Sequence, residues 1–269
     1  MSAIGLEILK NALIVAFFAS IVCGMVGALV YVNRLTFMAG GIAHSAYGGI
    51  GLSVFFDLPM VPVTLGYTFV VALIMGLLTR RDRSRIDSVI GLIWAGGMAL
   101  GVILMDLTPG YHVDMMSYLF GSLVMVSNRH ILFIVFMAVV VGIIVLGCYQ
   151  KFLIISFDEE FARSRGIAVD FFYYLLLILV ALAVVVLIQM VGLILIIALL
   201  SIPPYLSSFT ASSLAQMMLE SFLWSLCFCS LGILVAYYFN LSTGACIIAV
   251  AVVVGAIFMG LRRGLSLLR

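Results

Sequence analysis

The sequence contains few charged residues. Of its 269 residues, 9% are charged and 66% are hydrophobic, and the mean hydropathy is +1.37. Such a chain has too little polar surface to cover a water-soluble globule. No polar run is long enough to form a soluble domain. We therefore predict a single transmembrane domain over residues 1–269, surrounded by the lipid membrane and without a nucleic-acid partner.

Several signatures of enzymes and of secreted proteins are also missing. The chain has no Walker A pattern, so it is not expected to hydrolyse ATP, and no HExxH pattern of a zinc protease. Its five cysteines all lie in or at the ends of apolar segments, and we interpret them as small hydrophobic residues. The start of the chain has no basic leader or cleavage site, so the first apolar segment is expected to be retained as a helix.

Apolar runs of membrane length occupy most of the chain. A helix needs about 20 residues to cross a bilayer, and nine runs reach or approach that length, so we predict an all-α fold with about nine transmembrane helices. The runs are 12–32, 37–56, 61–79, 88–105, 131–149, 169–189, 191–206, 217–239 and 244–261. A tenth run, 115–127, has only 13 residues and follows the turn signal Thr108-Pro109-Gly110. It is too short to cross, so we predict a re-entrant helix.

The basic residues favour one topology. Cytoplasmic loops of membrane proteins carry an excess of lysine and arginine. With the N-terminus outside and the run 115–127 re-entrant, eleven of the thirteen basic residues are cytoplasmic; if that run crossed, only six would be. We therefore predict an external N-terminus and a cytoplasmic C-terminus. The apolar stretch 171–206 spans about 54 Å as a helix, too long for one crossing, so a break is expected between Gln189 and Gly192.

The second apolar run carries a histidine among small residues. Gly40 and Gly48 lie one helical turn before and after His44. The parallel stripe beside them consists of Gly41, Ser45 and Gly49. Small residues let helices approach closely, and here they leave space beside the imidazole for a small solute. The alternative is that His44 only joins two helices by hydrogen bonding.

The predicted topology places four ionisable residues outside: Asp57, Asp106, His112 and Asp114. Carboxylate and imidazole ligands suit zinc, manganese or iron. Their spacing matches no strong metal signature, so His112 and Asp106 are interpreted as solvated loop residues. Asp114 is the stronger candidate ligand, with His112 and Asp57 weaker ones. Asp114 could instead cap the re-entrant helix.

A short charged segment, 156–166, follows the fifth predicted span. Ser156 and Glu159 have capping-box spacing and Gly166 is placed to end a helix, which predicts a nine-residue surface helix. Phe157 and Phe161 share one face, and Glu159 can pair with Arg163. The segment could lie on lipid. Its mixture of both charge signs instead favours docking into a cytoplasmic partner.

Five motifs in order resemble the permease subunits of zinc and manganese ABC importers, over nearly the whole chain. They are AHSAYGG at 43–49, the arginine-rich loop before IDSVIGL at 86–92, VDMMSYLFGS at 113–122, FDEEFAR at 157–163 and VGLILIIALLSIP at 191–203. The resemblance implies a permease of a prokaryotic plasma membrane that moves zinc, manganese or iron inward by alternating access. It also implies a homodimer, cytoplasmic ATP-binding subunits and an extracytoplasmic solute-binding protein, with ATP used only by the partner and no permanently bound cofactor.

The resemblance also implies roles for individual residues. His44 matches the intramembrane histidine of the family, and the segment after the fifth span matches its ATPase-coupling helix. The coupling residues would be Phe157, Asp158, Glu159, Phe161, Ala162, Arg163 and Gly166. The sequence departs from the family at Gly40, where an aspartate is usual, and at Pro203-Pro204-Tyr205. The missing aspartate leaves the identity of the metal open.

Three other functions compete with this interpretation. An ABC importer of a metal chelate, such as a siderophore, haem or cobalamin, shares the same helices. An ion-gradient-driven secondary transporter would need buried carboxylates, and Glu220 is the one candidate. A membrane hydrolase using Ser45 and His44 is disfavoured, because neighbours on a helix point about 100° apart.

Overall fold

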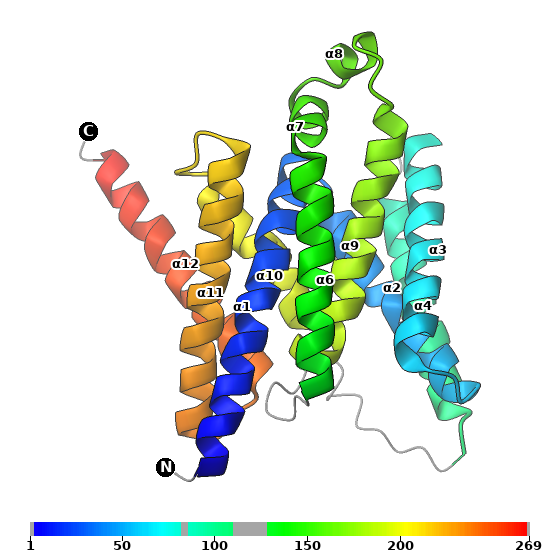
Figure 1. Ribbon diagram of the computed structural model, residues 1–269, viewed down its shortest axis with the longest axis vertical. Coiled ribbons are helices and arrows are strands. Elements are labelled where there is room, and N and C mark those ends of the chain that lie inside the picture. Colours follow the sequence, from blue (N-terminus) through cyan, green and yellow to red (C-terminus); the bar gives the residue numbers. More distant parts are fainter. Residues whose placement is uncertain (1–2, 82–85, 110–127, 268–269) are drawn as a thin grey trace.

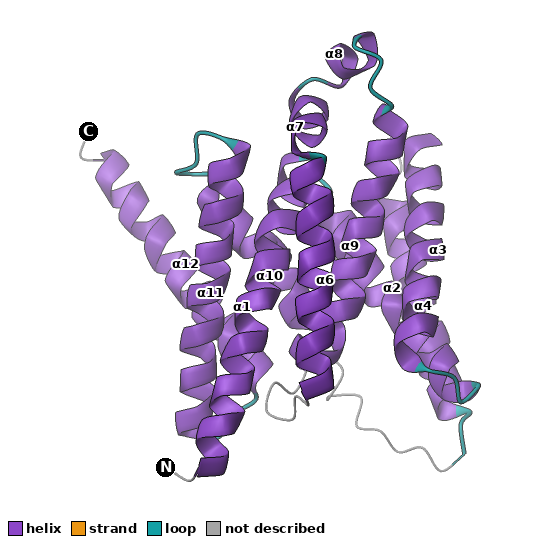
Figure 2. Ribbon diagram, viewed as in Figure 1, coloured by secondary structure: helices purple, strands orange, loops and turns teal. Residues whose placement is uncertain are grey.

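The computed structural model describes residues 3–81, 86–109 and 128–267, and this part of the chain forms eleven helices and no strands (Figure 2). The helices are α1 (Ala3–Val32), α2 (Thr36–Phe55), α3 (Met60–Arg81), α4 (Ile86–Asp106), α6 (Asn128–Gly147), α7 (Tyr149–Phe157), α8 (Glu159–Ser164), α9 (Val169–Val191), α10 (Leu193–Ser207), α11 (Leu214–Phe239) and α12 (Thr243–Leu267). The predicted re-entrant helix, with His112 and Asp114, lies outside the described residues.

Six of the described helices are long and apolar enough to cross a membrane: α1, α3, α4, α9, α11 and α12. The pair α6 and α7, bent by 63°, makes a seventh if it counts as one span. The all-helical membrane class is therefore confirmed, but the predicted count of nine crossings is not. The remaining two predicted spans correspond to α10, which has only 15 residues, and α2, whose apolar residues alternate with glycine, serine and histidine.

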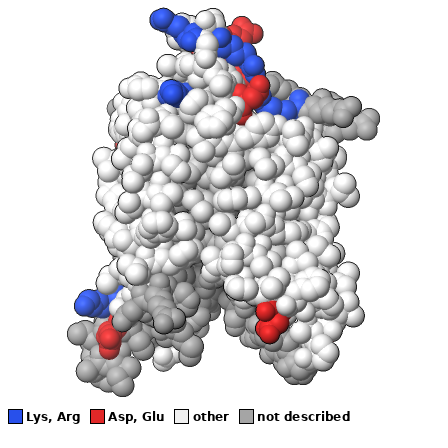
Figure 3. Space-filling view, turned by 45° about the vertical axis from the view of Figure 1, so that its right-hand side comes forward, with Lys and Arg blue, Asp and Glu red and all other residues white. Residues whose placement is uncertain are grey.

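The long helices lie side by side in a bundle, with α8 projecting from one end (Figure 1). The chain ends on the side of α8, and α1 begins at the opposite end (Figure 1). We call these the α8 end and the opposite end. In Figure 3 charged side chains lie near both ends of the molecule and leave a wide uncharged band between them. Because ionisable groups are costly inside a bilayer, this band fits a membrane-spanning protein.

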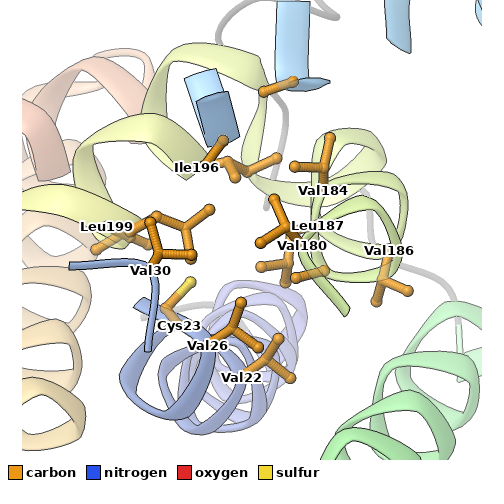
Figure 4. Packing of buried hydrophobic residues seen from close by; sticks show 14 of the residues in the cluster. Val22, Cys23, Val26, Val30, Val180, Val184, Val186, Leu187, Ile196 and Leu199 are labelled. Carbon is orange, nitrogen blue, oxygen red and sulfur yellow. The ribbon is translucent and has the colours of Figure 1, made fainter. Parts of the chain in front are cut away.

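The core forms where α1, α9 and α10 meet (Figure 4). Its labelled side chains are Val22, Cys23, Val26 and Val30 from α1, Val180, Val184, Val186 and Leu187 from α9, and Ile196 and Leu199 from α10. The break expected in the long apolar stretch lies at Gly192, whose φ is +83°. Only glycine adopts such a backbone at little cost, so the chain ends α9 here and starts α10.

Glycines bring α2 and α4 into close contact. A Cβ atom built on Gly97 of α4 would lie 2.8 Å from Ser45 Cα, and one built on Gly51 of α2 would lie 2.7 Å from Gly101 Cα. A real side chain cannot fit at either position. Small residues therefore determine this helix pair, which carries the candidate site.

Candidate functional site

His44 lies in the middle of α2, partly buried, with its ring stacked on Trp94 of α4. The ring centroids are 4.2 Å apart and the planes differ by 10°. The indole covers one face of the imidazole. Nδ1 is buried and makes no hydrogen bond to a described residue. A buried nitrogen normally has a partner, so His44 offers a ligand atom that the described protein does not use.

Open space adjoins His44 on the side of Gly40. Gly40 is buried, yet a Cβ atom built on it would meet no heavy atom within 4 Å. One residue further on, a Cβ on Gly41 would lie 2.6 Å from Ile90 Cγ2. Residues four apart share a helix face, so Gly40 and His44 together border this space.

The other small residues of α2 near His44 pack against neighbouring helices. Ser45 Oγ donates to the carbonyl of Gly41 at 2.7 Å and lies 3.3 Å from the carbonyl of Ile93 in α4. A Cβ on Gly48 would lie 2.5 Å from the Tyr67 hydroxyl, and one on Gly49 would lie 2.9 Å from Thr64 Cα. Gly41, Ser45, Gly48 and Gly49 therefore face α3 and α4, and Gly40 faces open space.

Asp57 lies at the opposite end, exposed, with a left-handed backbone of φ +51°. It lines, with Thr108 and Pro109, a cavity of about 380 Å³. Thirteen residues separate it from His44, roughly 20 Å at the helical rise, so the structure does not bring the two together. Asp106 is also exposed. Among the described residues, no three His, Cys, Asp or Glu side chains lie close enough to hold a metal ion.

The charged segment after α6 differs from its prediction. Ser156 belongs to α7 and accepts a hydrogen bond from Asn33 Nδ2 at 2.9 Å. Asp158 caps α8 instead, accepting from the Phe161 N–H at 2.8 Å. The predicted cap at Ser156 and the predicted length of nine residues are therefore wrong, since α8 has six. The reason is tertiary: the Ser156 hydroxyl is engaged by the end of α1.

Two aromatic side chains project from the α8 segment. Phe157 is 70% exposed and Phe161 is 45% exposed, whereas Ala162 is buried. Gly166 follows with φ +72°, a conformation that suits glycine and ends the segment. Large exposed apolar side chains beside charged groups are typical of an interaction surface.

A cavity of about 540 Å³ opens at the α8 end between α2, α3, α4 and the α7–α9 segment. Phe37 of α2 lines it, and the Phe37 ring lies 6.1 Å from the ring of Trp94. Because Trp94 stacks on His44, the rings of Phe37 and Trp94 connect the cavity wall to the histidine. Trp94 was not among the residues predicted from the sequence. The sequence feature that could have pointed to it is a tryptophan, one of only two in the chain, close to the small residues Gly96 and Gly97.

The sequence matches the model of a known family of transport proteins. The model of the ABC 3 transport family covers residues 5–261, so the chain belongs to this family of transport proteins. This confirms the resemblance noted above and the prediction that the chain is a transport subunit and not an enzyme.

Three relatives align with almost the whole chain. An uncharacterized membrane protein of Synechocystis sp. is 39% identical, with 98% of this chain and 94% of the relative covered. A probable metal transport system membrane protein of Chlamydia muridarum is 32% identical over 97% of this chain and 88% of the relative. The manganese transport system membrane protein MntC of Listeria monocytogenes is 27% identical over 91% and 88%.

The fold also resembles a solved structure, that of PsaBC from Streptococcus pneumoniae in complex with Fab. The TM-score is 0.85 at 29% sequence identity, and the match covers 93% of this chain and 90% of the other. The helical bundle of Figure 1 therefore has the same fold as the matched chain of the PsaBC structure.

Proposed function

We propose that the protein is the membrane permease of an ABC importer that moves a divalent metal ion into the cell, with manganese as the first candidate. The names of the relatives from Chlamydia and Listeria support a metal, and the Listeria name supports manganese. Zinc and iron remain candidates, because imidazole and oxygen ligands serve all three ions.

One observation carries the role of His44. Its Nδ1 is buried without a hydrogen-bond partner in the described protein, and the space beside Gly40 lies on the same face of α2. A cation passing through this space could bind the Nδ1 nitrogen of His44. A single imidazole binds weakly, which suits a transport pathway, where the ion must leave as readily as it enters.

The α8 end is the proposed contact with the ATPase. Phe157 and Phe161 are exposed there, and Asp158 and Glu159 lie beside them. We propose that α8 docks into a cytoplasmic ATP-binding subunit and that closure of two such subunits moves it. The α8 end would then be cytoplasmic and the N-terminus outside, in agreement with the basic residues at that end.

The complete importer would contain two copies of the permease, two ATP-binding subunits and an external solute-binding protein that delivers the metal. The ion would pass between alternating outward-open and inward-open states. Asp114 would contribute oxygen ligands near the external entrance, with His112 and Asp57 as weaker contributors.

The test is metal uptake by prokaryotic cells that express the full importer at equal membrane abundance. Wild type is expected to take up manganese, and His44→Ala is expected to lose most of that uptake. Ser53→Ala serves as control, since its hydroxyl also bonds within α2, to the carbonyl of Ile50. Uptake of zinc or iron and not manganese would correct the metal. No uptake of any free metal by wild type would refute the proposal and favour a chelate.

A further inference from the structure

Four charged side chains form a closed ring at the α8 end. Arg80 of α3 contacts Glu159 of α8 at 3.5 Å and also contacts Asp170 of α9. Arg163 of α8 contacts the same two carboxylates, Glu159 at 2.8 Å and Asp170 at 3.5 Å. Each arginine thus bridges both acids, and the ring ties α8 to α3 and α9.

The two arginines differ in what lies beneath them. The guanidinium carbon of Arg80 is 4.5 Å from the centroid of the Tyr173 ring, within range of a cation–π contact. The Arg80 side chain is 22% exposed, against 51% for Arg163. Arg163 only closes the ring on the surface, whereas Arg80 also extends it into the bundle.

Tyr173 continues the connection to α2. Its hydroxyl lies 3.2 Å from Thr79 Oγ1 of α3 and donates to Met38 Sδ of α2 at 3.8 Å. Met38 precedes His44 by six residues on the same helix, about 9 Å along its axis. A line of contacts therefore runs from α8 through Arg80 and Tyr173 to the helix that carries the candidate ligand.

The cavity of about 540 Å³ lies along this line, and Arg80, Glu159, Tyr173 and Met38 all line it. On that side the cavity lies between the α8 segment and the start of α2. Side-chain contacts, and not a continuous core, must then carry a displacement between them.

We propose that Arg80 is the positioning residue that transmits movement of α8 to α2. This rests on the proposed function, in which an ATP-binding subunit moves α8. Glu159 pulls on the guanidinium through a charge-assisted contact, which is stronger than a neutral one. Arg80 then shifts on Tyr173, whose hydroxyl contacts α2. The mechanical link then lies on α3, outside the α8 helix that docks on the ATP-binding subunit.

A purely structural role for the ring makes a different prediction. Exposed ion pairs contribute little to stability on their own. If the ring only steadied α8, loss of Arg80 or of Arg163 would act alike and weaken the hold of α8 on the ATPase. If Arg80 transmits movement, its loss leaves the ATPase bound and active but lowers the metal moved per ATP.

The experiment uses the complete importer in proteoliposomes, with manganese uptake and ATP hydrolysis measured together. Arg80→Gln is expected to retain the ATP-binding subunit while uptake per ATP falls about 3- to 10-fold. Arg80→Lys keeps the charge but loses the planar guanidinium, so its manganese uptake per ATP should lie between those of Arg80→Gln and wild type. Tyr173→Phe keeps the ring and loses the hydroxyl contacts with Thr79 and Met38, and should lower the metal moved per ATP less than Arg80→Gln does.

Lys151→Gln is the matched control. Lys151 is an exposed cation at the same end, 5.3 Å from the ring of Phe172, and is not one of the four charged side chains of the ring. An unchanged ratio in Arg80→Gln, or an equal fall in Lys151→Gln, would overturn the inference. If Arg80→Gln fails to assemble, Arg80→Lys and Tyr173→Phe decide in the same way.

A second measurement separates this inference from the proposed function. Spin labels at Glu160 of α8 and Thr36 of α2 report whether the two segments move together when ATP binds. A correlated shift in wild type that is lost in Arg80→Gln supports the link even if no free metal is transported. A shift that persists in Arg80→Gln refutes the link even if manganese uptake is confirmed.

Discussion

The α2–α4 pair and the α8 segment carry the two halves of the proposed function, and they are held by opposite means. His44 lies between helices whose glycines bring the backbones into contact, and its ring stacks on Trp94. Phe161 lies on a short helix that is tied to the bundle by ion pairs and is open to solvent. Close packing holds the His44 nitrogen in place, whereas ion pairs at the surface allow the α8 segment to move.

The difference indicates which changes each region tolerates. In the α2–α4 pair an added methyl group meets backbone, which cannot move aside. At the α8 segment a substituted side chain is exposed to water, so the fold should be retained and only binding to a partner should weaken. Four substitutions test this contrast, from the largest expected effect to the smallest.

Gly97→Val should do the most damage. Its Cβ would lie 2.8 Å from Ser45 Cα, so α4 must separate from α2. Overpacking costs roughly 1–3 kcal/mol even where side chains can adjust, and we expect more here. The yield of monodisperse protein in detergent and its thermal midpoint measure the effect. Gly96→Val is the control, because no heavy atom lies within 4 Å of its Cβ position. Equal stability of the two variants would contradict the tight packing.

Phe161→Asp should leave the fold intact and release the ATP-binding subunit. Loss of a central aromatic from an interface typically costs about 2 kcal/mol or more, roughly 30-fold in affinity. Co-purification with the ATPase and stimulated hydrolysis are the measurements. Phe56→Asp changes a phenylalanine that is 60% exposed at the opposite end and should leave both unaffected. Full co-purification of Phe161→Asp would show that α8 is not the docking site.

Trp94→Leu should weaken metal handling without removing the ligand. The stacked indole fixes the plane of the His44 ring, and residues that orient a ligand typically change metal affinity 10- to 100-fold. We expect roughly 10-fold lower uptake at limiting manganese. Leu92→Ala, on a side chain of α4 that is 75% exposed, is the control. If uptake of Trp94→Leu matches wild type, the stack has no role in transport.

Gly40→Asp should have the smallest and most specific effect. Its side chain has open space before it and would add a carboxylate one turn from His44. Oxygen ligands favour manganese over softer ions, so the ratio of manganese to zinc uptake should rise by a few-fold. Gly41→Asp gives the contrast in folding, since its Cβ would lie 2.6 Å from Ile90 Cγ2 and the yield of folded protein should fall, whereas that of Gly40→Asp should not. A ratio unchanged in Gly40→Asp would place the pathway elsewhere.

Much of the architecture follows from local sequence patterns. The break at Gly192 was expected because an apolar stretch cannot exceed the membrane thickness. The pairing of Glu159 with Arg163 was expected from their spacing of four residues, and the structure has it at 2.8 Å. The cap of α8 was predicted wrongly, because Ser156 and Asp158 both suit the start of a helix. Asn33, 123 residues away in the sequence, donates a hydrogen bond to Ser156.

The candidate site shows the same limit. The sequence singled out His44 and Gly40 through the spacing of small residues on one helix. It could not show that Gly40 borders open space while Gly41 is packed, because that depends on Ile90 of another helix. Trp94 is 50 residues from His44 in the sequence, and no local pattern joins them.

Composition and periodicity by themselves determined that this chain is a helical membrane protein, where most of its helices lie, and which histidine stands among small residues. The tertiary structure alone decided that Trp94 covers His44 and that Arg80 joins α8 to α3 and α9. The physical reason is range. Helix formation and membrane insertion depend on residues within a few turns of one another, whereas stacking and ion pairing need groups from different helices to meet.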